Sequence, residues 1–307
     1  MSEVSPGALP LTRIVASPRF PIGRVDPRLF GSFVEHMHRC VYTGIYEPGH
    51  ATADGAGFRG DVADLVREIG VPMVRYPGGN FVSGYDWENG IGPRDARGRV
   101  LDLAWGAVET NEVGTDEFVQ WCRAVNTEPM LAVNLGTRGV EAAARLVEYC
   151  NGTGSSELAD LRRRNGSTAP HDVRVWCLGN EMDGPWQIGH KTAEEYGRLA
   201  AETARAMRRV DPRVELVACG SSNSTTPTLG SWERTVLEQC NEDVDYLSVH
   251  CYYEQAHGDR GSFLASAVDG PVHRGLLRHR GRREGDAATH QDTRTLLRRV
   301  ERLVRAS

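Results

Sequence analysis

The amino-acid sequence predicts an α/β protein in which strand–helix units repeat around a parallel sheet. Between residues 30 and 253, short apolar runs alternate with amphipathic stretches of helical period. Polar and aromatic residues follow several of the apolar runs directly, which is where parallel α/β folds place their active sites. We therefore expect a (β/α)8 TIM barrel that is incomplete, with six recognisable strands.

Each unit can be placed along the chain. The apolar runs predict strands at 31–35, 72–76, 129–134, 173–178, 214–219 and 244–250. The amphipathic stretches predict helices over 60–69, 115–125, 140–150, 192–210 and 231–240. Thr192, with Glu194 and Glu195 after it, is typical of a helix start. No G-x-G-x-x-G follows the first strand and no G-x-x-x-x-G-K-[ST] occurs, so nucleotide binding is not favoured.

Composition narrows the possible partners and the compartment. A formal net charge of -5 gives no general attraction to nucleic acid or anionic lipid. The sequence has no apolar run long enough for a membrane span, and residues 1–11 lack the pattern of a secretion signal. The seven cysteines are an odd number, which favours reduced thiols over a disulfide framework. We expect a cytoplasmic protein with neither a nucleic-acid nor a membrane partner.

Glu181 is the strongest catalytic candidate. It follows the apolar strand 173–178 after Gly179 and Asn180. A carboxyl group held beside apolar or aromatic walls has its charged form desolvated, which raises its pKa and lets it donate a proton at neutral pH. The alternative is a structural glutamate that caps the next helix or pairs with an arginine.

Glu35 and His36 end the first predicted strand, and the stretch 35–40 contains a His-x-His-x-Cys pattern. Zinc sites gather three or four ligands from separated positions, so this pattern is a weak metal signal. We expect a polar substrate contact or a buried ion pair here, and no metal.

Further polar candidates lie at the ends of two other strands. Asn80 follows Pro77-Gly78-Gly79, and its carboxamide can both donate to and accept from vicinal hydroxyls. An ordinary turn asparagine is the alternative. His250 and Tyr252 alternate at the end of the last strand, so we expect them on the same side. A satisfied core histidine is the alternative for His250.

Three tryptophans lie in the loops after the second and fourth strands: Trp87, Trp105 and Trp186. Loop tryptophans often line carbohydrate sites, although packing beneath a long loop explains them equally well.

Several long segments resemble the intracellular α-L-arabinofuranosidases of glycoside hydrolase family 51. The resembling stretches are 30–50, 74–93, 128–140, 173–191 and 244–253, and the similarity runs from about residue 14 to about residue 269. The resemblance implies that Glu181 is the general acid/base and that Asn180 contacts the sugar 2-hydroxyl. It also implies a subsite for the terminal arabinofuranose lined by Glu35, Asn80, His250 and Tyr252.

The same resemblance carries expectations about activity and organisation. Members of this family remove non-reducing terminal α-L-arabinofuranosyl residues from arabinose-containing oligosaccharides with retention. They need no cofactor and are commonly homohexamers. The implied domains are a segment of a β-sandwich at 1–29, a partial barrel at 30–269 and a basic tail at 270–307 that lies outside the resemblance. Most of the family's C-terminal β-sandwich is then missing.

Two departures from the family pattern qualify this interpretation. His38 stands where the family usually has glycine, so an imidazole is expected to crowd the sugar pocket or to shift a carboxylate pKa. Retaining glycosidases also need two carboxylates about 5–5.5 Å apart. The family's nucleophile lies in a Phe-Asp-Glu-Trp-Asn-Val-Trp-Tyr segment, which this sequence lacks.

The tail suggests a cause for the missing nucleophile. Residues 270–307 contain ten arginines and four acidic residues, a net charge of +6, and no aromatic residue. A one-base shift in legal codons for residues 297–305 encodes the nucleophile segment. We therefore expect a frameshifted or truncated, disordered tail after about residue 269 and little or no hydrolysis. The alternatives are a non-catalytic sugar-binding or assembly subunit, and another retaining barrel glycosidase.

Overall fold

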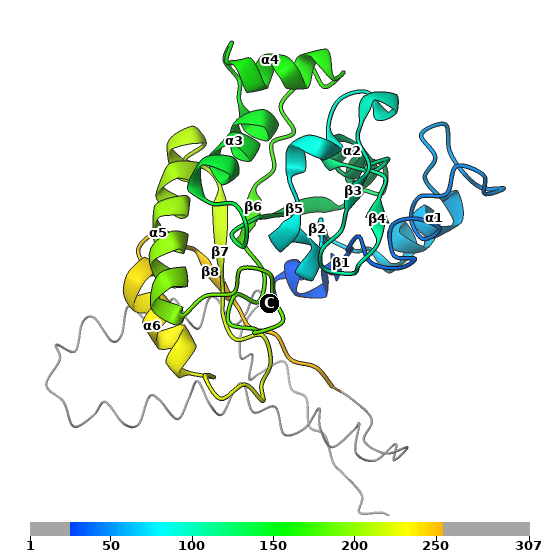
Figure 1. The fold of residues 1–307 in the computed structure, drawn as a ribbon. Coiled ribbons are helices and arrows are strands. Elements are labelled where there is room, and N and C mark those ends of the chain that lie inside the picture. Colours follow the sequence, from blue (N-terminus) through cyan, green and yellow to red (C-terminus); the bar gives the residue numbers. More distant parts are fainter. Residues whose placement is uncertain (1–24, 254–307) are drawn as a thin grey trace, which may run out of the picture.

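The structure is a computed structural model, and it describes residues 25–253. Six parallel strands form one sheet in the order β1-β2-β5-β6-β7-β8 (Figure 1). Their bounds are β1 (Ser32–Phe33), β2 (Met73–Tyr76), β5 (Glu128–Val133), β6 (Val175–Leu178), β7 (Glu215–Cys219) and β8 (Tyr246–Ser248). Neighbours in this order follow one another along the chain apart from the β3–β4 excursion, as in an incomplete (β/α)8 barrel. The predicted fold class is confirmed. The expected termini, residues 1–24 of the sandwich segment and the tail from 270, lie outside the described residues.

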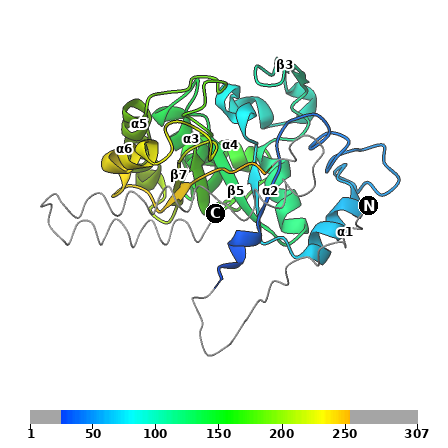
Figure 2. The same ribbon diagram turned by 90° about the horizontal axis from the view of Figure 1, so that it is seen from below.

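Helices follow the strands on the outer side of the sheet (Figure 1). They are α1 (Gly60–Ile69), α2 (Thr115–Ala124), α3 (Val140–Asn151), α4 (Glu157–Arg164), α5 (Ala193–Val210) and α6 (Ser231–Cys240). Helix α3 packs against α5, and α5 packs against α6. Figure 2 shows α1 and the α5–α6 pair at opposite ends of the array.

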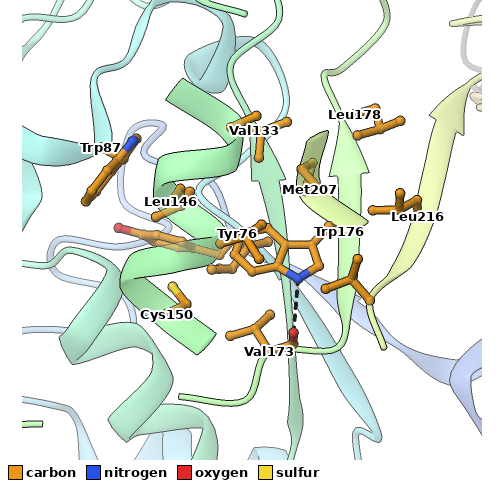
Figure 3. Close-up of a cluster of buried hydrophobic side chains, with 14 of the residues drawn as sticks. Tyr76, Trp87, Val133, Leu146, Cys150, Val173, Trp176, Leu178, Met207 and Leu216 are labelled. Carbon is orange, nitrogen blue, oxygen red and sulfur yellow. Dashed lines mark hydrogen bonds between the residues drawn. The ribbon is translucent and has the colours of Figure 1, made fainter. Parts of the chain in front are cut away.

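Alternation along the strands divides the sheet between two cores. Outward residues pack against the helices: Tyr76, Val133, Trp176, Leu178 and Leu216 meet Leu146 and Cys150 of α3 and Met207 of α5 (Figure 3). Inward residues form a smaller cluster of Met73, Ala132, Val175, Cys177 and Val217 with Val82. The inward cluster lies beneath the cavity described below. This alternation makes both faces of the central strands apolar, which explains the continuous apolar runs in the sequence.

The predicted start of α5 is confirmed at atomic level. Thr192 Oγ1 accepts a hydrogen bond from the Glu195 backbone N–H over 3.3 Å, and the Glu195 carboxylate accepts one from the Thr192 N–H over 2.9 Å. This reciprocal capping box satisfies two backbone donors that the first helical turn leaves free.

Helix α4 and the β3–β4 hairpin were not predicted. Helix α4 is short and polar, and its buried face includes Arg162, whose guanidinium donates to the backbone oxygen of Tyr149 over 2.7 Å. A short antiparallel hairpin, β3 (Val100–Leu101) with β4 (Val108–Glu109), interrupts the path from β2 to α2. Helix α4 has five charged residues among its eight, and each strand of the hairpin is only two residues long, so neither gives a recognisable apolar run.

An ionic clamp joins the amino-terminal ends of the strands. Arg28, in the 3-10 helix η1 (Pro27–Phe30), donates to Glu128 of β5 over 3.1 Å and to Glu215 of β7 over 2.9 Å. Tyr246 of β8 also donates to Glu215, over 2.7 Å. These contacts lie at the amino-terminal edge of the sheet, and the cavity described below opens at the opposite, carboxyl-terminal edge.

Candidate functional site

A cavity of about 990 Å³ opens at the carboxyl-terminal edge of the sheet and continues along its inner face. All six predicted site residues line it: Glu35, Asn80, Asn180, Glu181, His250 and Tyr252. They come from the ends of β1, β2, β6 and β8, because parallel strands end at the same edge of the sheet. The structure therefore brings together residues as far apart in the sequence as 35 and 252.

Glu181 is buried and held by three hydrogen-bond donors. Its Oε1 accepts from the Tyr252 hydroxyl over 3.0 Å and lies 2.8 Å from Nδ1 of His250. Its Oε2 accepts from the Trp186 indole N–H over 3.0 Å. The residue takes a left-handed backbone conformation (φ 45°), which departs from the extended strand before it. Glu181 is 6 % exposed, so a reacting group in the cavity meets a largely desolvated carboxylate.

The expected rise in the pKa of Glu181 is wrong for this arrangement. Burial does raise the pKa, but the hydrogen bonds and charge of His250, with the bonds from Trp186 and Tyr252, outweigh it and lower the pKa. These donors all favour the ionised form. A second carboxylate near Glu181 would oppose them, since like charges raise each other's pKa.

Asn180, next to Glu181, has its amide orientation set by Arg75. The Arg75 guanidinium donates to Asn180 Oδ1 over 2.9 Å and lies over the Phe33 ring at 5.4 Å. The Asn180 NH2 group consequently faces Asn80, whose Oδ1 is 3.4 Å away. Two carboxamides and a carboxylate thus present donors and acceptors to the same cavity, as a polyhydroxylated ligand requires.

Glu35 is held by two donors from the β2–α2 region. Its Oε1 accepts from the Phe81 backbone N–H over 3.0 Å and from the Trp105 indole over 3.1 Å. Gly78 makes room for it: a Cβ at Gly78, where φ is 145°, would lie 2.3 Å from Glu35 Cγ. The glycines before Asn80 therefore serve close packing against Glu35 as well as the turn.

His36 does not face the cavity and instead forms a buried ion pair. Its Nδ1 lies 2.8 Å from Glu109 Oε2, and its Nε2 lies 2.8 Å from the Tyr76 hydroxyl. The imidazole also stacks on Phe81 at 4.7 Å. The buried ion pair, one of the two roles expected for this stretch, is confirmed for His36. Within residues 25–253, no group of three or more potential ligand side chains is placed to hold a metal ion.

The three loop tryptophans have different surroundings. Trp87 is buried and donates to the Ala142 backbone oxygen over 3.2 Å, so it belongs to the core. Trp105 and Trp186 line the cavity and donate to Glu35 and Glu181 respectively. Core packing is confirmed for Trp87, whereas a carbohydrate contact of Trp105 and Trp186 stays a prediction.

His38 lies at the rim, and its expected crowding of the pocket is not observed. It is exposed, takes a left-handed conformation (φ 46°) and lies 6.0 Å from the Trp105 ring between centroids. It is not among the residues that line the described cavity. The positive φ explains why glycine suits this position.

Residue-by-residue inspection of the sequence missed Arg75 and Gln187 as site residues. Gln187 is buried, and its side chain donates to Ser83 and lies 3.5 Å from Asn180 Nδ2. A sequence signal did exist for Arg75, because it is a charged residue inside the apolar strand β2 that must be paired if it points inward.

Comparison with known proteins shows the family of this chain. The sequence model described as the alpha-L-arabinofuranosidase 1 domain matches residues 65–266. The chain is 59 % identical over 257 residues to "Intracellular exo-alpha-(1->5)-L-arabinofuranosidase 1" of Bacillus subtilis, covering 84 % of this chain and 51 % of that protein. It is 56 % identical over 279 residues to "Exo-alpha-(1->6)-L-arabinofuranosidase" of Bifidobacterium longum, covering 88 % and 53 % respectively.

Solved structures of α-L-arabinofuranosidases are also similar to this chain. A family 51 α-L-arabinofuranosidase from Bifidobacterium longum superposes with a TM-score of 0.80 and 51 % identity, covering 85 % of this chain and 54 % of that one. The Thermotoga maritima α-L-arabinofuranosidase in its arabinose complex gives a TM-score of 0.72 and 40 % identity, covering 82 % and 53 %.

The chain spans about half the length of these curated relatives. Every helix within residues 25–253 is too short or too polar to span a lipid bilayer. The extent and identity of the match leave no ambiguity about descent: the chain belongs to the α-L-arabinofuranosidases of glycoside hydrolase family 51.

Proposed function

We propose that this chain binds non-reducing terminal α-L-arabinofuranosyl residues of arabinose-containing oligosaccharides and carries the general acid/base of a retaining arabinofuranosidase. The observation that supports this most directly is the placement of Glu181, with its three donors, in one cavity with Glu35, Asn80 and Asn180. The relatives named as intracellular support a cytoplasmic location.

Each residue has a proposed part in the reaction. In the proposed reaction Glu181 hands its proton to the departing glycosidic oxygen and afterwards takes one from water. Its lowered pKa leaves it ionised at neutral pH in this arrangement, so it holds that proton only beside a second carboxylate, such as the nucleophile of a retaining pair. The amide of Asn180 bonds the sugar 2-hydroxyl, with its direction set by Arg75. Glu35 and Asn80 bind other hydroxyls of the terminal ring, while His250 and Tyr252 hold Glu181 and close that end of the subsite.

A retaining reaction also needs a nucleophile, and this determines how much activity we expect. Glu35 and Glu181 are the carboxylates that line the described cavity. Glu35 is engaged by Phe81 and Trp105 and is assigned to sugar binding. The family's nucleophile segment does not occur in the sequence. We therefore propose sugar binding with little or no hydrolysis by this polypeptide, as in a binding or assembly subunit. The homohexamer implied by the resemblance remains a proposal that light scattering of the purified chain would test.

Binding and turnover should be measured on the same full-length preparation. Calorimetric titration with methyl α-L-arabinofuranoside is expected to show binding, which Asn180→Ala weakens at least tenfold. Methyl β-D-xylopyranoside is titrated as the control, because binding of this sugar in place of the arabinofuranoside would indicate a different barrel glycosidase. Hydrolysis of 4-nitrophenyl α-L-arabinofuranoside is expected to stay near background. Turnover abolished by Glu181→Gln would show that another carboxylate acts as nucleophile, and absence of binding would refute the proposed function.

A further inference from the structure

Asn223, in the loop between β7 and α6, lines the cavity together with Glu181 and Trp186. We infer that Asn223 recognises the sugar on the leaving-group side, by donating a hydrogen bond from its NH2 group to a hydroxyl of that residue. This inference rests on the proposed function and extends it to the second sugar of the substrate.

The side chain of Asn223 is oriented by its own turn. Its Oδ1 accepts from the Thr225 backbone N–H over 3.4 Å and from the Ser224 hydroxyl over 3.3 Å. The Asn223 backbone oxygen accepts from the Thr226 hydroxyl over 2.8 Å. Because the carbonyl end of the amide faces the turn, the NH2 end is the free one, and no acceptor for it occurs among residues 25–253.

The loop is anchored at the two residues that precede Asn223. The Asp183 carboxylate, two residues after Glu181, accepts from the Ser222 backbone N–H over 3.0 Å and from its hydroxyl over 3.1 Å. Buried Glu233 of α6 accepts from the Ser221 N–H over 2.6 Å. These charge-assisted bonds fix the position of Asn223 relative to Glu181 without any ligand, which lowers the ordering cost of binding.

The order of the strands assigns Asn223 to the leaving group. A general acid lies between the ring that is retained and the group that departs, because it protonates the oxygen joining them. Glu35, Asn80 and Asn180, which hold the terminal ring, come from β1, β2 and β6. Asn223 follows β7, on the far side of β6 from β1 and β2. His250 and Tyr252, which follow β8 on that side, are engaged by Glu181 itself. Asn223 is therefore assigned to the sugar beyond the scissile oxygen.

The test compares one sugar with two. Affinities for methyl α-L-arabinofuranoside and for the α-(1→5)-linked arabinobiose are measured by calorimetry on the full chain and its variants. The wild-type chain is expected to bind the disaccharide about 5–10-fold more tightly, as one added hydrogen bond implies. Asn223→Asp keeps the acceptor of the turn but loses the donor, so it should lose this increment while binding the methyl glycoside as before. Asn223→Ala should behave alike. Thr225 is an exposed neighbour whose side chain bonds no residue within 25–253, so Thr225→Ala should retain the increment.

The calorimetric results for the Asn223 variants either support or overturn the inferred contact with the second sugar. Loss of the increment in both Asn223 variants, with Thr225→Ala unchanged, supports the inference. An increment that survives in the Asn223 variants, or a wild-type chain that binds both ligands equally, overturns it and leaves the proposed function standing. A wild-type chain that binds neither ligand refutes the proposed function as well.

Discussion

Tyr252 donates its phenolic hydrogen to Oε1 of Glu181 over 3.0 Å, although 71 positions separate the two residues in the sequence. This hydrogen bond shifts the pKa values of the two residues in opposite directions. Burial and the adjacent Glu181 charge raise the pKa of Tyr252 to about 12, while the donated hydrogen bond contributes to lowering that of Glu181. Tyr252, which follows β8, therefore contributes to the ionisation of a residue that follows β6.

Removing a donor should raise the pKa of Glu181. Tyr252→Phe and Trp186→Phe each delete a hydrogen bond to the ionised carboxylate, so the ionised form loses stabilisation relative to the protonated form. Carboxyl-carbon NMR titration, with the Glu181→Gln spectrum to identify the signal, measures the shift. A pKa that stays constant or falls in both variants would contradict the proposed electrostatics.

The pH dependence of stability follows with a definite sign. Because the folded-state pKa of Glu181 lies below its ordinary value of 4.5, its contribution to the free energy of unfolding is fully present above pH 4.5. It is lost as the pH falls through the folded-state pKa. Denaturant unfolding at several pH values should show a smaller acid loss of stability in Glu181→Gln than in the wild-type chain. Equal losses would mean that Glu181 is not stabilised as an anion.

Gly78→Ala should damage both stability and sugar binding. The new Cβ would lie 2.3 Å from Glu35 Cγ, and φ of 145° is strained for alanine. We expect a loss of about 1–3 kcal/mol in the free energy of unfolding. Gly98→Ala is the matched control, since a Cβ there meets nothing within 4 Å. Similar melting temperatures for the two variants would argue against the close packing at Glu35.

Substitution of Trp105 should affect mainly sugar binding, and substitution of Trp87 should affect mainly stability. Trp105→Phe removes the indole donor to Glu35 and should weaken methyl α-L-arabinofuranoside binding about 5–10-fold with little change in melting temperature. Trp87→Phe removes a buried bond to Ala142 and should cost about 1–2 kcal/mol of stability with little change in affinity. Calorimetry and thermal unfolding on both variants check the pair, and reversed effects would show that their surroundings are misassigned.

Trp176 should be the most costly truncation in the outer core. It is fully buried between the sheet and α3–α5 and donates to the Val173 backbone oxygen over 3.0 Å (Figure 3). Trp176→Ala is expected to lower the free energy of unfolding by about 3–5 kcal/mol. Leu65→Ala on exposed α1, where Leu65 is 56 % exposed, should change it by less than about 0.5 kcal/mol. Urea unfolding provides the comparison, and a Trp176 effect as small as the Leu65 effect would contradict the packing.

The fold was predictable because its signals are local. Apolar runs such as 173–178 and helical periods such as 192–210 are set by neighbouring residues, and the structure places β6 and α5 there. Helix α4 escaped prediction because its buried face includes the charged Arg162, whose guanidinium donates to the backbone oxygens of Ser167 and Tyr149 outside the helix. The spacing of apolar residues does not report a buried charge that is paired in this way.

By itself, the sequence determined which side chains reach the carboxyl-terminal edge of the sheet, because residues such as Glu35, Asn80 and Glu181 directly follow their own strands. Only the tertiary structure decided what surrounds them. Whether Trp87 or Trp105 meets the cavity, and whether the pKa of Glu181 rises or falls, depends on donors and walls contributed by segments far apart along the chain. Electrostatic and packing energies depend on distance in space, and the sequence specifies that distance only through the completed fold.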